Sequence, residues 1–283
     1  GKGLIGSDVN DDDFIIHFKR ANTHDNILFF TTNGKVFQTK VYEIPAGSRT
    51  SKGRAIHNFL EIPTSEEISA VISYSNKKED LRRFLVMVTQ QGLIKKTLLE
   101  DFLSVPRSGI IALTLKQGDL LKWVGISSGN DHIVITTSHG QSIRFKESDC
   151  RSTGRLASGV TAIRLKKGNS VSSMEIINHD DLKSDLKLLI IMSNGFGKLS
   201  LLKEYKVQRR GGSGVKAAKV TAKTGEIISA KAIKDETELL ALSLKGQIIK
   251  TFIKDIRVAG RATQGVRIMS LKTNDKIAGI VIL

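Results

Sequence analysis

A basic, glycine-rich stretch from Gln208 to Gly214, QRRGGSG, carries the clearest chemical signal in the sequence. From Tyr205 to Gly225 there are six cationic side chains and no acidic one. Glycine permits positive φ angles and close approach of another molecule, and arginine offers a planar fork of donors that suits phosphate oxygens. This stretch therefore favours binding of a polyanion.

The same loop recurs along the chain at a constant distance from a preceding hairpin glycine. In four copies the closing glycine follows the hairpin glycine by 19 residues, and in a shortened copy Gly109 follows Gly92 by 17. The four regular pairs are Gly34 and Gly53, Gly140 and Gly159, Gly195 and Gly214, and Gly246 and Gly265. One arginine occupies the same place in each copy, namely Arg49, Arg107, Arg155, Arg210 and Arg261.

Repeated placement distinguishes these arginines from ordinary surface charge. A single lysine is best interpreted as solvating an exposed face, whereas phosphate contacts dominate sequence-tolerant binding of nucleic acid. We therefore predict contacts to nucleic-acid phosphates from the loops and the cations beside them. The predicted residues are Lys2, Arg49, Lys52, Arg54, Lys95, Lys96, Arg107, Arg144, Lys146, Arg155, Lys206, Gln208, Arg209, Arg210, Lys216, Lys250, Arg261 and Arg267.

The composition agrees with an acidic partner. The chain of 283 residues has a net charge of +16 and a pI near 9.9, which favours nucleic acid first and an anionic membrane surface second. No apolar run approaches the roughly 20 residues that span a bilayer, and the amino end lacks a signal-peptide pattern, so we expect a cytoplasmic protein. The single cysteine, Cys150, excludes an internal disulfide and a thiolate metal cluster.

The elements that position the loops are predicted to be β-strands in units of about 50 residues. In the first complete unit, Ile27 to Phe30 forms a strand covered on both faces, Asn33-Gly34 a hairpin, and Val36 to Val41 the returning strand. Two further strands, over 55–62 and 68–73, complete a four-stranded blade. The expected boundaries within one all-β domain, 1–283, are a partial blade at 1–26 and blades at 27–80, 81–130, 131–185, 186–236 and 237–283.

Catalytic chemistry finds little support, and we expect no catalytic residue, cofactor or metal. His24-Asp25 and Asp131-His132 each lack a third ligand and are better interpreted as turn residues at a strand entrance. Gly1, Gly3 and Gly6 spell GxGxxG, but no strand precedes them and an acidic run follows where a helix is needed.

At the level of motifs the whole chain resembles the family of carboxy-terminal domains of the DNA gyrase A protein. QRRGGSG at 208–214 is similar to the seven-residue box of that family, with Ser213 where lysine or arginine is usual. Other stretches similar to the family are ANTHD (21–25), VYEIP (41–45), RFKES (144–148) and GRATQG (260–265). The resemblance implies a six-bladed β-pinwheel that wraps DNA around its rim, in a bacterial, nucleoid-associated setting.

The resemblance also implies partners and limits. The partners are double-stranded DNA, the remainder of the gyrase A protein and the gyrase B protein, and the family's cleaving tyrosine and metal site belong to a region outside this chain. The family's functional box precedes the first full unit, where this chain has Gly1-Lys2-Gly3, so we expect it to be truncated here; the copy at 208–214 lies in a later unit. Alternatives are the corresponding domain of topoisomerase IV and a propeller scaffold that binds an acidic protein.

Overall fold

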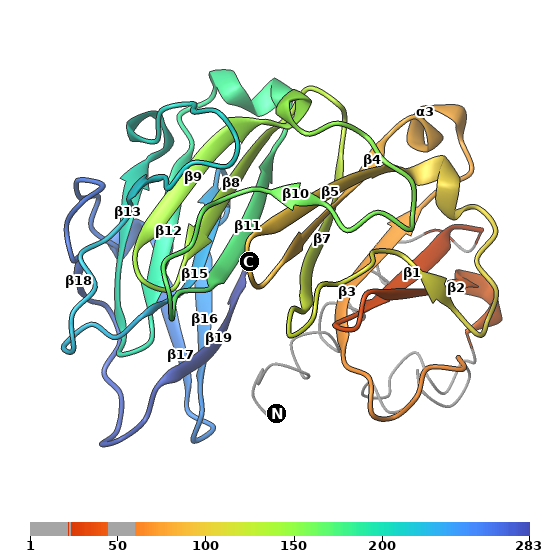
Figure 1. The fold of residues 1–283 in the computed structure, drawn as a ribbon. Helices are drawn as coiled ribbons and strands as arrows, with labels where there is room; N and C mark the ends of the chain where they lie inside the picture. Colours follow the sequence, from red (N-terminus) through yellow and green to blue (C-terminus); the bar gives the residue numbers. More distant parts are fainter. Residues whose placement is uncertain (1–21, 23, 45–59) are drawn as a thin grey trace. The chain divides into compact units, whose positions relative to one another are not determined.

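The computed structural model describes residues 22, 24–44 and 60–283, which form β-sheets joined by short turns (Figure 1). Their contacts divide the described chain into two compact units, one within 22–129 together with 150–160 and the other 130–149 with 161–283. In the described part of the chain, no helix is long and apolar enough to cross a membrane.

The first unit contains two four-stranded sheets, ordered β3-β1-β2-β6 and β10-β5-β4-β7. Leu28 and Phe30 of β1 pack with Leu85 and Met87 of β4 in one core between the two sheets, and every residue of β1 is buried. The strands are β1 (Asn26–Thr31), β2 (Lys35–Lys40), β3 (Ile68–Tyr74), β4 (Phe84–Thr89), β5 (Leu93–Leu98), β6 (Ile110–Ile111), β7 (Leu121–Ser127) and β10 (Val160–Thr161).

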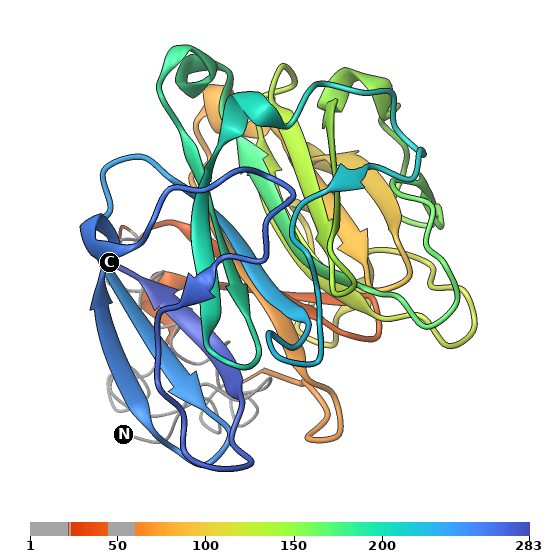
Figure 2. The ribbon, with the colours of Figure 1, turned by 90° about the vertical axis from the view of Figure 1, so that its left-hand side faces the viewer.

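The second unit contains three sheets, ordered β11-β8-β9-β14, β15-β12-β13-β18 and β17-β16-β19 (Figure 2). Alternate residues of β12 point to opposite faces, so that Leu188 and Ile190 enter one core and Leu189 and Ile191 enter another. The strands are β8 (His132–Thr137), β9 (Gln141–Lys146), β11 (Val171–Ile177), β12 (Lys187–Met192), β13 (Phe196–Leu201), β14 (Val215–Lys216), β15 (Ile227–Ile233), β16 (Glu238–Ser243), β17 (Ile248–Phe252), β18 (Val266–Arg267) and β19 (Ile277–Ile282).

Short helical turns follow the strands and were not predicted from the sequence. A 3-10 turn comes after the second strand of each hairpin, where the chain leaves the sheet. These turns are η1 (Val41–Glu43), η3 (Leu99–Phe102), η4 (Glu147–Asp149), η6 (Leu202–Glu204) and η7 (Ile253–Asp255); α3 (Lys78–Leu81) and η5 (His179–Lys183) lie in the polar links between repeats.

The outer strand of a sheet comes from the following repeat, which corrects the expectation that each repeat builds its own blade. β6 pairs with β2, β14 with β9 and β18 with β13, and these outer strands have two residues each, although continuous strands were expected over 110–115, 215–220 and 266–271. The loop that carries the repeated arginine lies immediately before each of them. Each arginine loop therefore crosses from its own repeat onto the sheet of the preceding one. The first repeat's own third segment, 55–62, lies largely outside the described residues.

The expectation of six four-stranded blades is wrong. The described residues form five sheets, four with four strands and one with three, β17-β16-β19. The all-β architecture and the repeated sheet are as expected. Continuous apolar runs identified the buried strands well, because a sheet covered on both faces has no polar side along its central strand.

Candidate nucleic-acid interface

The loop from Gln208 to Gly214 lies across the preceding repeat and is anchored to it through its backbone. The Gln208 amide donates to the Arg144 carbonyl over 2.7 Å, and the Gly211 amide donates to the Ala162 carbonyl over 2.8 Å. Val215 then pairs with Ser142 in β9. These bonds fix the loop at both ends, so its side chains project from a defined backbone.

Arg210 is held by carbonyl oxygens of the preceding repeat. Its Nε donates to the Asp149 carbonyl over 3.1 Å, and its Nη1 donates to the Thr161 carbonyl over 2.6 Å. Both acceptors are neutral, so the positive charge of the half-buried guanidinium is not compensated by them. Because a guanidinium has five N–H donors, Nη2 remains available to an anion.

Arg261 repeats this arrangement one repeat later. Its Nη1 donates to the carbonyl of Lys216, which occupies the same place in β14 that Thr161 occupies in β10. Its backbone amide also donates to Glu204 Oε1 over 3.3 Å. The arginine recurrence in the sequence thus corresponds, in these two loops, to a recurring bond between consecutive repeats.

Arg107 and Arg155 have different surroundings. Arg107 belongs to the shortened loop, its side chain is 67% exposed, and its Nη2 lies 3.8 Å from Glu43 Oε2. Arg155 is half-buried, and its backbone carbonyl accepts a hydrogen bond from Lys95 Nζ over 2.5 Å. The four of these arginine positions that the structure describes are therefore not equivalent electrostatically.

Two of the predicted DNA contacts, Lys95 and Lys96, are buried inside the protein and not exposed on its surface. Lys95 is 1% exposed, and besides Arg155 its ammonium donates to the Ala112 carbonyl over 2.5 Å. Lys96 is buried, with Nζ 4.6 Å from the centre of the Phe84 ring. Strand alternation alone does not distinguish a cation that points outward from one buried beneath a loop of the next repeat.

Arg144 also has a structural environment. Its Nε donates to His132 Nδ1 over 3.1 Å, and its Nη1 donates to the carbonyls of Leu202 and Tyr205 over 3.2 and 3.3 Å. Burial lowers the pKa of His132, and the neighbouring Arg144 guanidinium lowers it further. The lowered pKa favours the neutral imidazole, whose Nδ1 accepts the hydrogen bond from Arg144.

The remaining predicted residues divide by exposure. Lys146, Lys206, Arg209, Lys216, Lys250 and Arg267 are exposed, and Gln208 is half-buried. Lys250 Nζ lies 3.0 Å from Glu238 Oε1, and the Arg267 guanidinium lies 5.3 Å from the centre of the Phe196 ring. Lys2, Arg49, Lys52 and Arg54 lie outside the described residues.

The closing glycines are required by the crossing of the chain. Gly159, Gly214 and Gly265 all have positive φ angles of 74 to 90°. A Cβ on Gly265 would lie 2.5 Å from the Gly197 carbonyl oxygen, and one on Gly159 would lie 2.7 Å from that of Ile94. At these closing positions the glycine is explained by close approach of the preceding strand, whereas a Cβ on Gly211 or Gly212 would meet nothing closer than 3.5 Å.

A lysine that the sequence reasoning missed, Lys198, lies beneath the Arg261 loop. It is 1% exposed, and its Nζ donates to the carbonyls of Gly260, Arg261 and Thr263 over 2.9, 2.6 and 2.8 Å. The signal was available, because Lys198 and Lys95 both stand three residues after a hairpin glycine.

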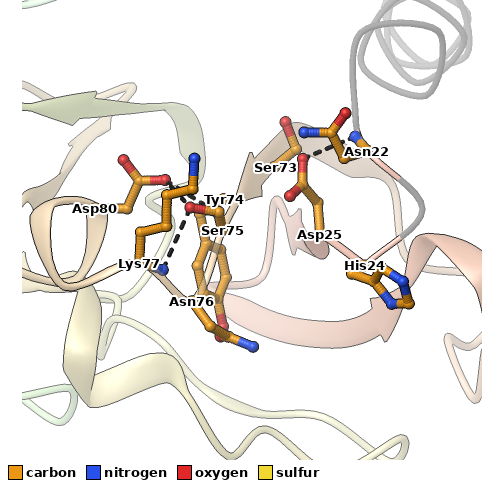
Figure 3. A pocket seen from close by; sticks show the side chains of 9 residues that line it. All are labelled: Asn22, His24, Asp25, Ser73, Tyr74, Ser75, Asn76, Lys77 and Asp80. Atoms are coloured by element: carbon orange, nitrogen blue, oxygen red, sulfur yellow. Dashed lines mark hydrogen bonds between the residues drawn. The ribbon is translucent and has the colours of Figure 1, made fainter.

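A cavity of about 750 Å³ in the first unit includes the His24-Asp25 pair (Figure 3). Asp25 Oδ2 accepts the backbone amide of Asn22 over 2.9 Å, while Asp80 Oδ2 accepts the Ser75 hydroxyl over 2.5 Å. Asp25 thus closes the turn that leads into β1. In the described residues no three His, Cys, Asp or Glu side chains gather as metal ligands would.

Comparison with known proteins supplies the family. Residues 1–22, 25–72, 83–128, 131–178, 187–234 and 237–283 match the model of the DNA gyrase C-terminal domain, beta-propeller. The chain is 37% identical over 282 residues to the DNA gyrase A protein of Mycolicibacterium smegmatis, covering 99% of this chain and 33% of that protein. It is 37% identical over 271 residues to the DNA gyrase A protein of Staphylococcus epidermidis, covering 96% of this chain and 30% of that protein.

Solved structures agree on the fold. A DNA gyrase A C-terminal domain aligns with a TM-score of 0.75 at 23% identity, covering 92% of this chain and 83% of that one. The C-terminal domain of a DNA topoisomerase IV aligns with a TM-score of 0.83 at 25% identity, covering 93% and 80%. The chain spans about a third of the length of the curated gyrase proteins that it matches. The matching family model and these relatives place this chain in the family of DNA gyrase A C-terminal domains.

Proposed function

We propose that this chain binds, bends and wraps double-stranded DNA as a non-catalytic accessory domain of a type IIA topoisomerase, supporting negative supercoiling by DNA gyrase. The observation that carries the proposal is the environment of Arg210 and Arg261, whose guanidinium groups are fixed by neutral carbonyls at equivalent places in successive repeats. A cation that is already ordered loses less conformational entropy when it binds a phosphate.

The surrounding charges support a phosphate partner. Lys206, Arg209 and Lys216 are exposed around the Arg210 loop, and Arg267 is exposed beside the Arg261 loop. The net charge of +16 supplies long-range attraction to a polyanion. Phosphate contacts carry no base information, so we expect binding that is nearly independent of sequence.

The proposed partners in the complete enzyme are the remainder of the gyrase A protein and the gyrase B protein. DNA cleavage and ATP hydrolysis are assigned to those parts. The role of this chain is to bend and wrap the DNA. Bending duplex DNA costs several kcal/mol for a short site, so the chain must offset that cost with many contacts.

A linking-number assay tests wrapping directly. Nicked circular DNA is sealed with ligase in the presence and absence of the 283-residue chain, the protein is removed, and topoisomers are separated on a gel. Wrapping shifts the topoisomer distribution in proportion to the protein added. An unshifted distribution, at protein concentrations that saturate the DNA, contradicts wrapping.

Salt dependence of duplex binding tests the phosphate contacts. We expect log affinity to fall by at least about three per tenfold rise in salt, because each phosphate contact contributes a slope near 0.9. An acidic polypeptide such as polyglutamate should bind more weakly than duplex DNA at the same salt concentration. Tighter binding to polyglutamate would favour the acidic-protein scaffold instead.

A further inference from the structure

Two buried lysines occupy the same place in the second and fourth repeats. Lys95 in β5 and Lys198 in β13 each stand three residues after a hairpin glycine, and each is 1% exposed. The first and third repeats have Phe37 and Ile143 there, and both are buried. The fold therefore accepts an apolar side chain at this position, and a charged one has to be offset by specific partners.

Each lysine donates to backbone carbonyls of the arginine loop in the following repeat, and Lys95 also donates to a carbonyl of its own repeat. Lys198 Nζ donates to the Gly260, Arg261 and Thr263 carbonyls and lies 3.3 Å from Thr263 Oγ1. Lys95 Nζ donates to the Arg155 carbonyl and to the Ala112 carbonyl. In both repeats the ammonium thus bonds to the backbone of the repeated arginine itself.

Burial holds the pKa of each lysine at about 8. The charged groups facing Lys95 are the Arg155 guanidinium, which lowers its pKa further, and Asp101, which raises it. Those facing Lys198 are Glu204, which raises its pKa, and Arg261, which lowers it. Both ammonium groups are therefore charged at neutral pH but close to losing their protons.

We propose that Lys95 and Lys198 are positioning residues for DNA binding, whose ammonium groups clamp the Arg155 and Arg261 loops from below. The inference rests on the proposed function, because it assigns the clamped arginines to phosphate. The DNA affinity of the clamped loops then depends on the protonation of the lysine beneath them. The DNA affinity of the loops above Phe37 and Ile143 does not depend on such a proton. The residue three positions after the hairpin glycine thus determines which repeats respond to pH.

A double-mutant cycle tests whether Lys198 acts through Arg261. The variants are Lys198→Ile, which takes the residue of the third repeat, Arg261→Ala, and the two together. We expect Lys198→Ile to reduce the salt slope of duplex binding by about one, as loss of a phosphate contact does, and to add little once Arg261 is alanine. Full additivity, or unchanged affinity and slope in a folded Lys198→Ile protein, overturns the inference.

The matched control is Lys78→Ala, which removes one positive charge from α3. It should leave the slope unchanged, so a loss seen with Lys198→Ile cannot be assigned to net charge. Circular dichroism and thermal unfolding establish that each variant is folded.

Duplex affinity of the unmodified chain as a function of pH tests the clamp without a substitution, and it serves as the test if Lys198→Ile fails to fold. Duplex affinity at constant ionic strength should fall between about pH 7 and about pH 9, as the clamps lose charge, and affinity that is level over this range overturns the inference. A folded variant with both Lys95→Ile and Lys198→Ile should have lost this fall. If the unmodified chain binds DNA but shows neither effect, only the clamp is wrong; if it does not bind DNA, the proposed function fails.

Discussion

The loops of Arg107 and Arg261 begin from the same motif and reach different electrostatic states. Arg261 bonds to a neutral carbonyl, and a buried ammonium holds the backbone beneath it. Arg107 lies in a loop two residues shorter and faces the carboxylate of Glu43 at 3.8 Å. The Arg261 guanidinium is thus paired with a neutral oxygen, although Glu204 accepts its backbone amide, whereas the Arg107 guanidinium faces a carboxylate.

The contrast shows that a repeated residue is not a repeated site. The closing glycine, the crossing strand and the arginine are common to both loops, because the crossing requires the glycine whatever the arginine does. The partner of the guanidinium and the residue beneath the loop vary independently. The repeat thus supplies a scaffold on which each loop's charge is set separately.

The largest effect is expected from breaking the crossing itself with Gly265→Ala. An alanine there would have a φ angle of 77°, and its Cβ would lie 2.5 Å from the Gly197 carbonyl oxygen. We expect the substitution to lower the unfolding free energy by about 2–4 kcal/mol. Gly109→Ala should cost a similar amount, since its φ angle is also 77° and its Cβ would lie 2.5 Å from a carbon of the buried Phe37 ring. Chemical denaturation measures both, with Gly154→Ala, which meets nothing within 4 Å, as the near-neutral control. Equal losses at all three positions would contradict the crossing geometry.

The next effect concerns DNA binding by the two kinds of loop. Replacing Arg210 and Arg261 together by alanine should lower the salt slope by about two, one for each phosphate contact. Arg107→Ala should lower it by less than about one, because Glu43 already offsets that charge. Fluorescence anisotropy with a labelled duplex over a salt series measures the slopes. Equal slopes for Arg107→Ala and Arg261→Ala would remove the distinction between the loops.

The buried lysines predict a stability that rises with pH. Their pKa is about 8 in the folded chain and near 10.4 when unfolded, so between these values the unfolded state binds more protons. Unfolding free energy should therefore increase from about pH 8 to about pH 10, by about 2 kcal/mol for each lysine. Urea denaturation at several pH values measures it. Lys95→Met should flatten the rise, and a falling curve in the unmodified chain would contradict the assignment.

The smallest effect is expected from cations away from the loops. Replacing Lys77 and Lys78 by alanine removes two exposed charges at the start of α3, and duplex affinity should change by about twofold or less at about 0.15 M salt, where distant surface charges are screened. A loss as large as that of Arg210→Ala, measured in the same anisotropy assay, would mean that total charge and not loop placement determines binding.

Most strands could be predicted from the sequence, because sheets covered on both faces require continuous apolar runs. The runs at 84–88 and 188–192 lie within β4 and β12. The exchange of outer strands could not be predicted, since a two-residue strand such as Ile110–Ile111 has the same pattern whichever sheet it joins. The number of sheets was overestimated by counting repeats.

The DNA contacts of the site residues stay a prediction. In the described repeats the spacing of the arginines marked equivalent loops, but it carried no information on what each guanidinium bonds. Lys95 was assigned to the surface because a lysine in a strand is usually solvated, and one of its two carbonyl acceptors, that of Arg155, comes from a loop 60 residues later. A contact between residues so far apart in the sequence produces no pattern in the residues around Lys95, so its burial could not be predicted from them.

Because the outer strand of a sheet comes from the following repeat, a sequence repeat and a folded sheet begin and end at different residues. Cutting the gene between two sheets would separate an outer strand such as β14 from β9, with which it pairs. A duplication or deletion preserves every sheet only when both of its ends fall at matching points of two repeats. Recombination within the repeat, at any matched pair of points, can therefore lengthen or shorten such a protein, and can move an arginine loop with its glycine while leaving behind the lysine that lies beneath it.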